Sequence, residues 1–273
     1  KKPNPLLEAV ALTLRSYAFA QLTELWGDIP FTQALQGAKG IYTPGYDPQQ
    51  TVYTDPHLGI LPSLRRADSL LKATPNGIIS GDMLYNSHTS MWRGFMNALR
   101  LMYLFRVSSK LDPTAEMQSI VSDGATMQSI AGSGVLALPT VTPYNFVSLT
   151  ERSGDFAVKY LNSTLSDAFV ATADTSRLTT YFTTNANTPA GTPFNFSNYG
   201  GMPIVVDATT TQVNQASNFN PSFTSGNNSS IIKAKIMTYA EQEFILAEAT
   251  LKGYVPGGST AAENYYDNGI IGA

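Results

Sequence analysis

One stretch of the chain, residues 90–107, constrains the fold more strongly than any other. Its sequence is SMWRGFMNALRLMYLFRV. Apolar residues recur in it at spacings of three and four, and Trp92, Leu99 and Leu101 cover much of the remaining circumference. A helix that is apolar nearly all round is a buried helix. The stretch therefore predicts a helix inside the protein, with one stripe made of Met91, Phe95, Ala98, Met102 and Phe105.

A long helix is predicted at the start of the chain. Asn4 and Pro5 are a typical N-cap and first helical residue, and Gly27 with Pro30 is a typical stop. Trp26 is therefore the last side chain of this helix, which points away from a binding role for it. The apolar residues at helical spacing, which predict the core-facing stripe, are Leu7, Val10, Leu14, Ala18, Leu22 and Leu25.

Other helices are predicted from start signals and apolar spacing. One follows Asp55-Pro56 and runs through Leu71, and a shorter one follows Asp112-Pro113. Further helices are expected over residues 155–172 and 239–253, and from Ser259 or Thr260 towards Gly269.

Two regions lack helical periodicity. Residues 37–54 are rich in Gly, Pro and Tyr and are predicted to be loop. From 174 to about 230 the chain is Thr, Asn, Ser, Gly and Pro with scattered Phe and Tyr. Loops of this length are functional or disordered in most proteins, and the aromatic residues argue against disorder.

The last two predicted helices carry a tetratricopeptide signal. Ile245, Ala249, Ala261 and Tyr265 occupy the large, small, small and aromatic positions of such a unit. Small residues at these positions let two antiparallel helices approach closely. The match is partial, because Lys252 stands where an aromatic is usual and Asn268 where an alanine is usual.

Composition excludes several function classes. Charged residues make up 14% and the net charge is −3, so the chain offers no basic face to nucleic acid. No apolar run approaches the ~20 residues that span a bilayer. The absence of cysteine excludes disulfides, cysteine-ligated zinc and a thiol nucleophile in this chain.

Recognisable catalytic motifs are missing, and we predict neither a cofactor nor a metal. His57 and His88 lie 31 positions apart and are interpreted as ordinary surface or capping residues. Glu241 and Glu248 share a helix face and could serve as the paired acids of a glycosidase. The favoured reading for the acids of this helix, Glu243 included, is a first-turn acid and a structural hydrogen bond.

Other charged residues could also be considered catalytic, but we predict structural roles for them. Asp174 and Arg177 are predicted to close a local turn rather than to form an active pair. The polar side chains on the apolar helix are predicted to be structural, because buried arginine normally binds carbonyls or a carboxylate; they are Arg93, Asn97, Arg100 and Arg106.

Five blocks, in this order, together resemble the SusD/RagB family. They are LTELWGDIPFTQAL, PGYDPQQTVYTDPHLGIL, DMLYNSHTSMWRGFMNALRLMYLFRVS, DTSRL and AEQEFILAEATLKG. The resemblance implies a mainly α-helical, all-α protein, with tetratricopeptide-like helix pairs forming a right-handed superhelical scaffold and long irregular loops carrying the ligand face. It implies one SusD-like domain over residues 1–273, with a loop-rich ligand-face insertion at approximately 174–232.

The resemblance also implies a location and a role. Such proteins are lipoproteins on the outer surface of the outer membrane of Bacteroidota-type bacteria. They bind glycans or other nutrients without catalysis and partner a SusC-like TonB-dependent transporter. This chain has neither the signal peptide nor the lipid-bearing cysteine of that family, and family members continue beyond its last helix. We therefore expect both ends to be missing and the membrane anchor to lie outside the chain.

The expected ligand is a polysaccharide or oligosaccharide, with a peptide as a further possibility. Sugar rings stack on exposed aromatic rings, and amide groups hydrogen-bond their hydroxyls, so the aromatic residues of the irregular region are the candidates. Two alternatives stay open, an all-helical glycoside hydrolase and a tetratricopeptide scaffold that grips a peptide. The candidate ligand-binding residues are Tyr144, Phe146, Tyr181, Phe194, Phe196 and Tyr199.

Overall fold

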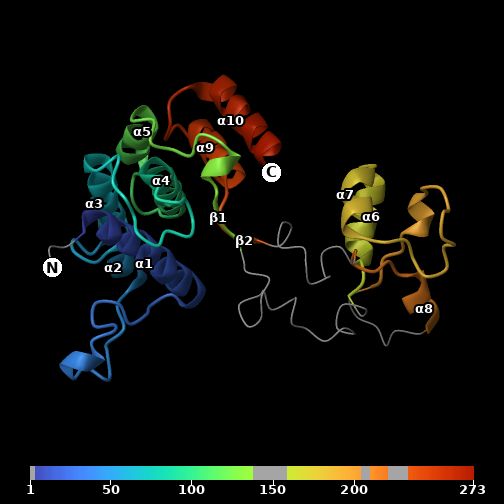
Figure 1. Cartoon of the computed structure of the whole chain (residues 1–273), viewed down its shortest axis with the longest axis horizontal. Helices are drawn as coiled ribbons and strands as arrows, with labels where there is room; N and C mark the ends of the chain where they lie inside the picture. The colour runs from blue at the N-terminus through green and yellow to red at the C-terminus, as the bar shows by residue number, and fades with distance from the viewer. Residues whose placement is uncertain (1–3, 138–158, 204–209, 221–232) are drawn as a thin grey trace. The chain divides into compact units, whose positions relative to one another are not determined.

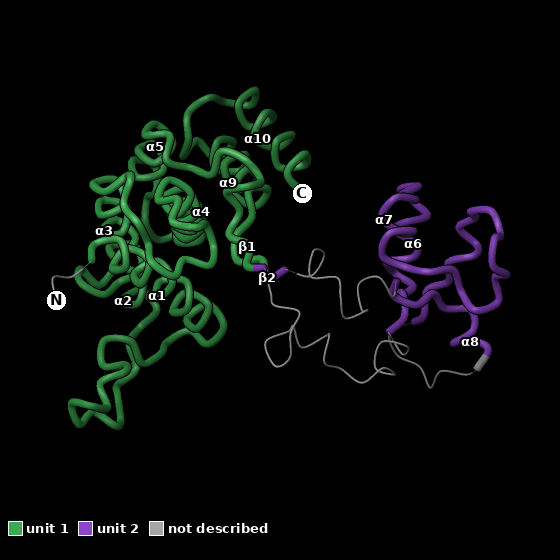
Figure 2. Tube along the Cα trace, viewed as in Figure 1, with its two compact units in different colours: residues 1–136, 235–273 green, residues 137–234 purple. Residues whose placement is uncertain are grey.

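The computed structural model describes residues 4–137, 159–203, 210–220 and 233–273. Contacts divide the chain into two compact units, residues 1–136 with 235–273 (unit 1) and residues 137–234 (unit 2) (Figure 2). Each unit has its own cluster of buried apolar side chains. The chain therefore leaves unit 1 once and returns to it for its last helices.

Unit 1 is a bundle of helices around α4 (Figure 1). The central helix α4 contacts α1, α3, α5 and α9. The sequence prediction of a mainly helical protein with a buried central helix is therefore confirmed. The helices are α1 (Pro5–Trp26), α2 (Gln49–Thr54), α3 (Ile60–Ala73), α4 (Thr89–Arg106), α5 (Thr114–Ser122), α9 (Tyr239–Leu251) and α10 (Gly258–Gly272).

Helix α4 is buried on most of its circumference. Phe95, Leu99 and Leu101 are completely enclosed, as the apolar pattern predicts. Gly94 lies against the backbone of Thr126, where a Cβ atom would come within 3.1 Å of the carbonyl oxygen. A glycine at this position therefore lets the segment after α5 approach the central helix.

Helices α1 and α3 form an antiparallel pair. Glu8, near the start of α1, forms an ion pair of 2.6 Å with Arg66 in α3. Further along α1, Arg15 donates a hydrogen bond of 3.0 Å to the carbonyl of Leu58, just before α3. Helix α1 starts where predicted, because Asn4 accepts a hydrogen bond from the backbone of Leu6.

The predicted core-facing stripe of α1 is wrong. Leu25 is 70% exposed, and Leu7, Leu14 and Leu22 are exposed as well. The opposite side faces α3 and consists largely of small residues, which let the two helix axes approach closely. Two of its hydroxyl groups are satisfied by backbone carbonyls, since Thr13 donates to Ala9 at 2.8 Å and Thr23 donates to Gly27 at 2.6 Å. The buried residues are Leu6, Ala9, Thr13, Ser16, Phe19, Ala20 and Thr23.

Hydrogen bonds fix the turn after α1 and the loop that follows it. Gly27 has φ 73°, a conformation that favours glycine, and donates to the carbonyl of Thr23 at 2.8 Å. The carboxylate of Asp47 accepts hydrogen bonds from the backbone of Phe31 and Thr32, and the bond from Thr32 is the main cause of its lowered pKa. Phe31 is thereby held in the core.

The predicted loop over residues 37–54 contains a helix. α2 (Gln49–Thr54) buries Val52 and Tyr53 against the rest of unit 1. Its two buried positions in six residues are too short a pattern to reveal a helix, so the Gly and Pro residues around it dominated the prediction.

Helices α9 and α10 form the pair predicted from the tetratricopeptide signal. They are antiparallel, since Gly269 of α10 approaches Phe244 and Gly272 approaches Tyr239 near the start of α9. Ala249 is completely buried. Thr238 and Glu241 form a reciprocal capping box that starts α9.

Two short strands lie at the boundary of unit 1. β1 (Gly134–Ala137) pairs with β2 (Lys233–Met237) in a two-stranded sheet, at the points where the chain leaves unit 1 and returns to it. Within the described residues, none of the helices combines the length and the apolar character needed to cross a bilayer.

Unit 2 is built on a small aromatic cluster. Leu161, Phe169, Leu178 and Phe182 are its buried members. Its helices are α6 (Ser163–Ala171), α7 (Thr175–Tyr181) and α8 (Thr210–Gln215) (Figure 1). The described part of the predicted helix over 155–172 is therefore helical only from residue 163. Two helices, α7 and α8, also occur where the sequence predicts loop.

Helix α7 begins with a local cap that the sequence analysis had identified as a turn. The side chain of Asp174 accepts a hydrogen bond of 3.1 Å from the backbone of Arg177. The guanidinium of Arg177 also forms an ion pair with the carboxylate of Asp174. Both interactions close the first turn of a helix, so the structural interpretation of this pair is confirmed.

Candidate functional site

Three of the predicted ligand residues lie together in unit 2, on the segment 192–199, here called the aromatic loop. The ring centroid of Phe194 lies 5.0 Å from that of Phe196, at an interplanar angle of 78°. The ring of Tyr199 lies 5.8 Å from Phe194. The loop therefore presents a group of three aromatic rings rather than isolated side chains.

The three rings differ in exposure. Phe196 and Tyr199 are partly buried and pack against the apolar cluster of unit 2. Phe194 is 47% exposed. The two inner rings therefore support the outer one, and a platform that is already formed loses little conformational entropy when a ligand stacks on it.

Asparagine side chains shape the aromatic loop. Asn195 accepts hydrogen bonds of 2.9 Å from both the backbone and the hydroxyl of Ser197, which starts a short 3-10 turn (Phe196–Asn198). The side chain of Asn198 donates to the carbonyl of Pro193 at 3.2 Å. Asn195 itself is exposed, and its amide nitrogen donates to no residue that the structure describes. Among the described residues, the Asn195 amide is thus an unpaired donor, next in sequence to the exposed Phe194.

The remaining predicted ligand residues are not in the aromatic loop. Tyr181 is the last residue of α7 and is 41% exposed. Its carbonyl accepts a hydrogen bond from the backbone of Asn220 at 2.8 Å. Tyr144 and Phe146 lie outside the described residues. The role of all six residues in ligand binding stays a prediction.

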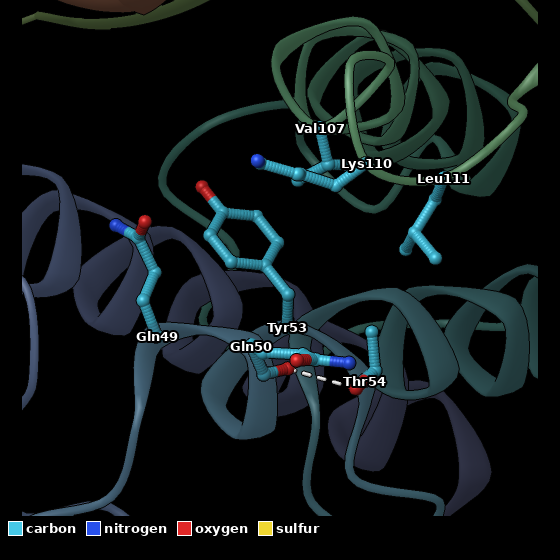
Figure 3. Close-up of a pocket in the computed structure, with 7 residues that line it drawn as sticks. All are labelled: Gln49, Gln50, Tyr53, Thr54, Val107, Lys110 and Leu111. Carbon is cyan, nitrogen blue, oxygen red and sulfur yellow. Dashed lines mark hydrogen bonds between the residues drawn. The ribbon is translucent and has the colours of Figure 1, made fainter.

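Unit 1 contains a pocket that the sequence analysis missed, here called the α2 pocket. It has a volume of about 350 Å³ and lies between α2 and the turn that follows α4 (Figure 3). The backbone of Lys110 and Leu111 donates to the carbonyl of Val107, which folds this turn back beside α4. The lining residues are Gln49, Gln50, Tyr53, Thr54, Val107, Lys110 and Leu111.

The sequence contains little signal for this pocket, because residues 37–54 are predicted as loop and the other wall begins at Val107, 54 positions after Tyr53. Tyr53 is the central side chain and donates a hydrogen bond of 2.8 Å to Glu24 in α1. Burial, together with Glu24, raises the pKa of the Tyr53 hydroxyl. Tyr53 is therefore neutral at physiological pH.

The acids that could have formed a glycosidase pair have other roles. Glu241 caps α9 through Thr238. Glu243 is buried and accepts hydrogen bonds from Gln242 at 2.9 Å and Asn268 at 3.3 Å. Glu248 is half-exposed and pairs with Lys252 one turn away. Glu241 is thus the predicted first-turn acid, Glu243 makes the structural hydrogen bonds, and Glu248 is held in a surface ion pair.

The arginines of α4 are structural, as predicted. Arg93 pairs with Asp68 of α3 at 2.7 Å and also with Asp123. Arg100 contacts Glu116 of α5 at 2.6 Å. These pairs tie three helices of unit 1 together and leave the two arginines no free charge for a ligand.

The histidines take part in no metal cluster. The backbone of His57 donates to the carboxylate of Asp55 at 2.9 Å, and His88 is the residue before α4. No group of three or more potential ligand side chains that could hold a metal ion occurs in the described ranges.

Comparison with known proteins identifies what the chain is similar to. A family model for SusD-like proteins, described as "Starch-binding associating with outer membrane", matches residues 2–273. No curated protein matches the chain. Solved structures give the fold independently.

Three solved structures illustrate the similarity. A Bacteroides vulgatus ATCC 8482 protein, proposed to reside in the outer membrane and to bind nutrients, has 29% identity and a TM-score of 0.82, over 96% of this chain and 57% of its own. A SusD homologue of Bacteroides fragilis NCTC 9343 has 28% identity and a TM-score of 0.79, over 97% and 57%. A chitin-binding SusD homologue of Flavobacterium johnsoniae has 22% identity and a TM-score of 0.72, over 97% and 51%.

The similarity has a defined extent. The chain spans 57% of the length of the first two of these structures. The F. johnsoniae protein is too distant in sequence to indicate more than a shared fold.

Proposed function

The chain belongs to the SusD-like family of starch-binding proteins that associate with the outer membrane, and from this premise we propose that it binds glycans or other nutrients at the cell surface. In this proposal the aromatic loop is the contact site and no chemistry is performed on the ligand. The bound nutrient is handed to a SusC-like TonB-dependent transporter.

The observation that carries the proposal is the exposed ring of Phe194 on its two supporting rings. The C–H face of a sugar ring stacks on such a platform, and the free amide of Asn195 can donate to a hydroxyl beside it. Pre-formed sites with a few polar groups around an apolar surface are typical of small-ligand binding. In domain terms, we propose that residues 174–232 are the ligand-face insertion of one SusD-like domain.

The test is affinity electrophoresis and calorimetry with starch, chitin oligosaccharides and other polysaccharides. Phe194→Ala should weaken binding to the best ligand about tenfold, in line with the ~1–3 kcal/mol measured for rings that stack on bases. The matched control is Trp26→Ala, which removes an aromatic ring that is 67% exposed at the end of α1. Equal losses for both variants, or a loss only for Trp26→Ala, would contradict the site.

The transporter partner requires a separate experiment. The full-length protein, expressed in its native host, should co-purify with a transporter barrel from outer membranes. Repeated purification without a barrel would contradict the partner while leaving the glycan site standing.

The glycosidase alternative finds no support in the positions of its candidate acids. Glu241 is used in a helix cap and Glu248 in a surface ion pair. Release of reducing sugar that is lost on Glu248→Gln would reopen that alternative.

A further inference from the structure

We propose that the α2 pocket is a second binding site, specific for a small hydroxylated carboxylate the size of one sugar acid. The site is independent of the aromatic loop, because it lies entirely within unit 1. Three features support it: its volume, the charge of its lining and the arrangement of its polar groups.

The volume suits a single ring. Ligand pockets range over ~300–1,000 Å³, and the α2 pocket, at about 350 Å³, lies at the lower end of that range. An extended oligosaccharide would not fit within it. One sugar ring, or the terminal ring of a chain, is the appropriate size.

The charge of the lining favours an anion. Lys110 is the one charged residue among the seven that line the pocket, and its ammonium group forms no ion pair with a described residue. Glu24, which reaches Tyr53, is neutralised by an ion pair with Arg106. Asp112, two positions beyond Lys110, accepts hydrogen bonds from Thr114. A carboxylate in the pocket therefore meets a cation that pairs with no residue the structure describes.

The neutral polar groups suit hydroxyls. Gln50 makes no side-chain hydrogen bond to a described residue, so its amide can both donate and accept. Gln49 donates through its amide nitrogen to the carbonyl of Thr23 at 2.9 Å, which leaves its amide oxygen as an acceptor. Figure 3 shows both glutamines around Tyr53, whose ring stands up from α2 towards the segment that carries Lys110.

The apolar part of the lining is provided by Val107 and Leu111 after α4. Aliphatic side chains can contact the C–H groups of a sugar ring while its hydroxyls face the amides. The pocket thus combines one cation, two amide groups and an aliphatic surface. This is the pattern expected for a sugar acid rather than for an apolar ligand or a polyanion.

Glucuronic acid is the probe, and glucose is its uncharged match. Calorimetry or saturation-transfer NMR on the purified chain should detect glucuronate at low ionic strength and much weaker binding of glucose. Lys110→Met should weaken glucuronate binding about tenfold, because a hydrogen bond to a charged group contributes ~1.5–3 kcal/mol. Lys39→Met, at an exposed lysine outside the pocket, should leave the affinity unchanged.

Two further variants keep the result unambiguous. Leu111→Glu introduces a negative charge at the pocket and should abolish glucuronate binding in a protein whose circular dichroism spectrum is unchanged. Phe194→Ala should leave glucuronate binding intact, which separates this site from the aromatic loop. Equal affinity for glucose and glucuronate would overturn the ligand class, and absence of glucuronate binding would overturn the site.

Discussion

The side chain of Gln242 and the backbone of Met127 form a reciprocal pair of hydrogen bonds. The Met127 amide donates to Oε1 of Gln242 at 2.7 Å, and Nε2 of Gln242 donates to the Met127 carbonyl at 3.0 Å. Both residues are buried and lie 115 positions apart. One glutamine of α9 thereby satisfies a backbone segment that no strand or helix pairs.

Removal of this side chain should be costly. Gln242→Ala leaves the buried N–H and C=O of Met127 without partners, each of which costs ~1–3 kcal/mol. We expect the free energy of unfolding to fall by about 2–6 kcal/mol, measured by urea denaturation. Gln118→Ala, on the exposed face of α5, is the control and should change it by less than about 0.5 kcal/mol. Equal effects would show that the pair is unimportant.

A second prediction concerns the buried face of α1. The hydroxyl of Ser16 is buried without a hydrogen-bond partner among the described residues. Ser16→Ala should therefore raise the melting temperature, by an amount corresponding to about 1 kcal/mol.

Leu25→Ala tests the same helix from its other side. Because Leu25 is largely exposed, we expect a loss below about 0.5 kcal/mol in the same thermal scan. A loss of ~2–5 kcal/mol, the value for a buried leucine, would restore the stripe that the sequence predicted.

Glu243 gives the protein a pH dependence of a definite sign. Burial raises the pKa of its carboxyl, although hydrogen bonds from Gln242 and Asn268 oppose this. The protonated form of Glu243 is therefore favoured in the folded state. Its contribution to the free energy of unfolding is fully present below the pKa that Glu243 has in the unfolded chain, and it is lost as pH rises through the pKa of the folded protein.

The variant Glu243→Gln removes this ionisation. It should be more stable than the wild type at pH 7.5, and the difference should shrink at pH 4, as measured by urea denaturation at both values. Asn268 can turn its amide to present an oxygen to the new side chain. Glu248→Gln, at a half-exposed ion pair, should show no comparable gain. If the wild type were more stable than Glu243→Gln at pH 7.5, the predicted sign of the pH dependence would be wrong.

Gly200 should be essential for unit 2. A Cβ atom there would lie 1.7 Å from the carbonyl oxygen of Gln215, which is backbone and cannot move aside easily. Gly200→Ala should remove hydrogen-exchange protection from the helices of unit 2 while α4 stays protected. Gly191→Ala, which meets no atom within 4 Å but has φ 81°, should cost only the ~1–2 kcal/mol of left-handed backbone.

Local signals account for the parts of the fold that the sequence predicts well. Asn4 and Gly27 mark the ends of α1 through hydrogen bonds that reach only a few residues. The apolar circumference of α4 and the small residue Ala249 of the last helix pair indicate burial by themselves. The grouping of the three rings of the aromatic loop can also be predicted from the sequence, because Phe194, Phe196 and Tyr199 lie within six positions of one another.

Other features need partners that are distant in sequence. Leucine spacing in α1 resembles a core stripe, but the side of the helix that is buried carries mostly small residues, which let α3 approach closely. The α2 pocket brings Tyr53 and Lys110 together, and no sequence pattern around either residue indicates that the two are neighbours.

The sequence by itself determined the helical class, the ends of α1 and α4, the buried central helix and the family. These properties depend on spacing and caps within a few turns of chain, where hydrogen bonds and side-chain contacts are local. Only the tertiary structure decided which face of α1 is buried, that Gln242 binds Met127, and that a pocket forms beside Tyr53 whose one cation, Lys110, pairs with no described residue. Each depends on how residues far apart in the chain fill space together, and packing of that kind leaves no periodic trace in the sequence.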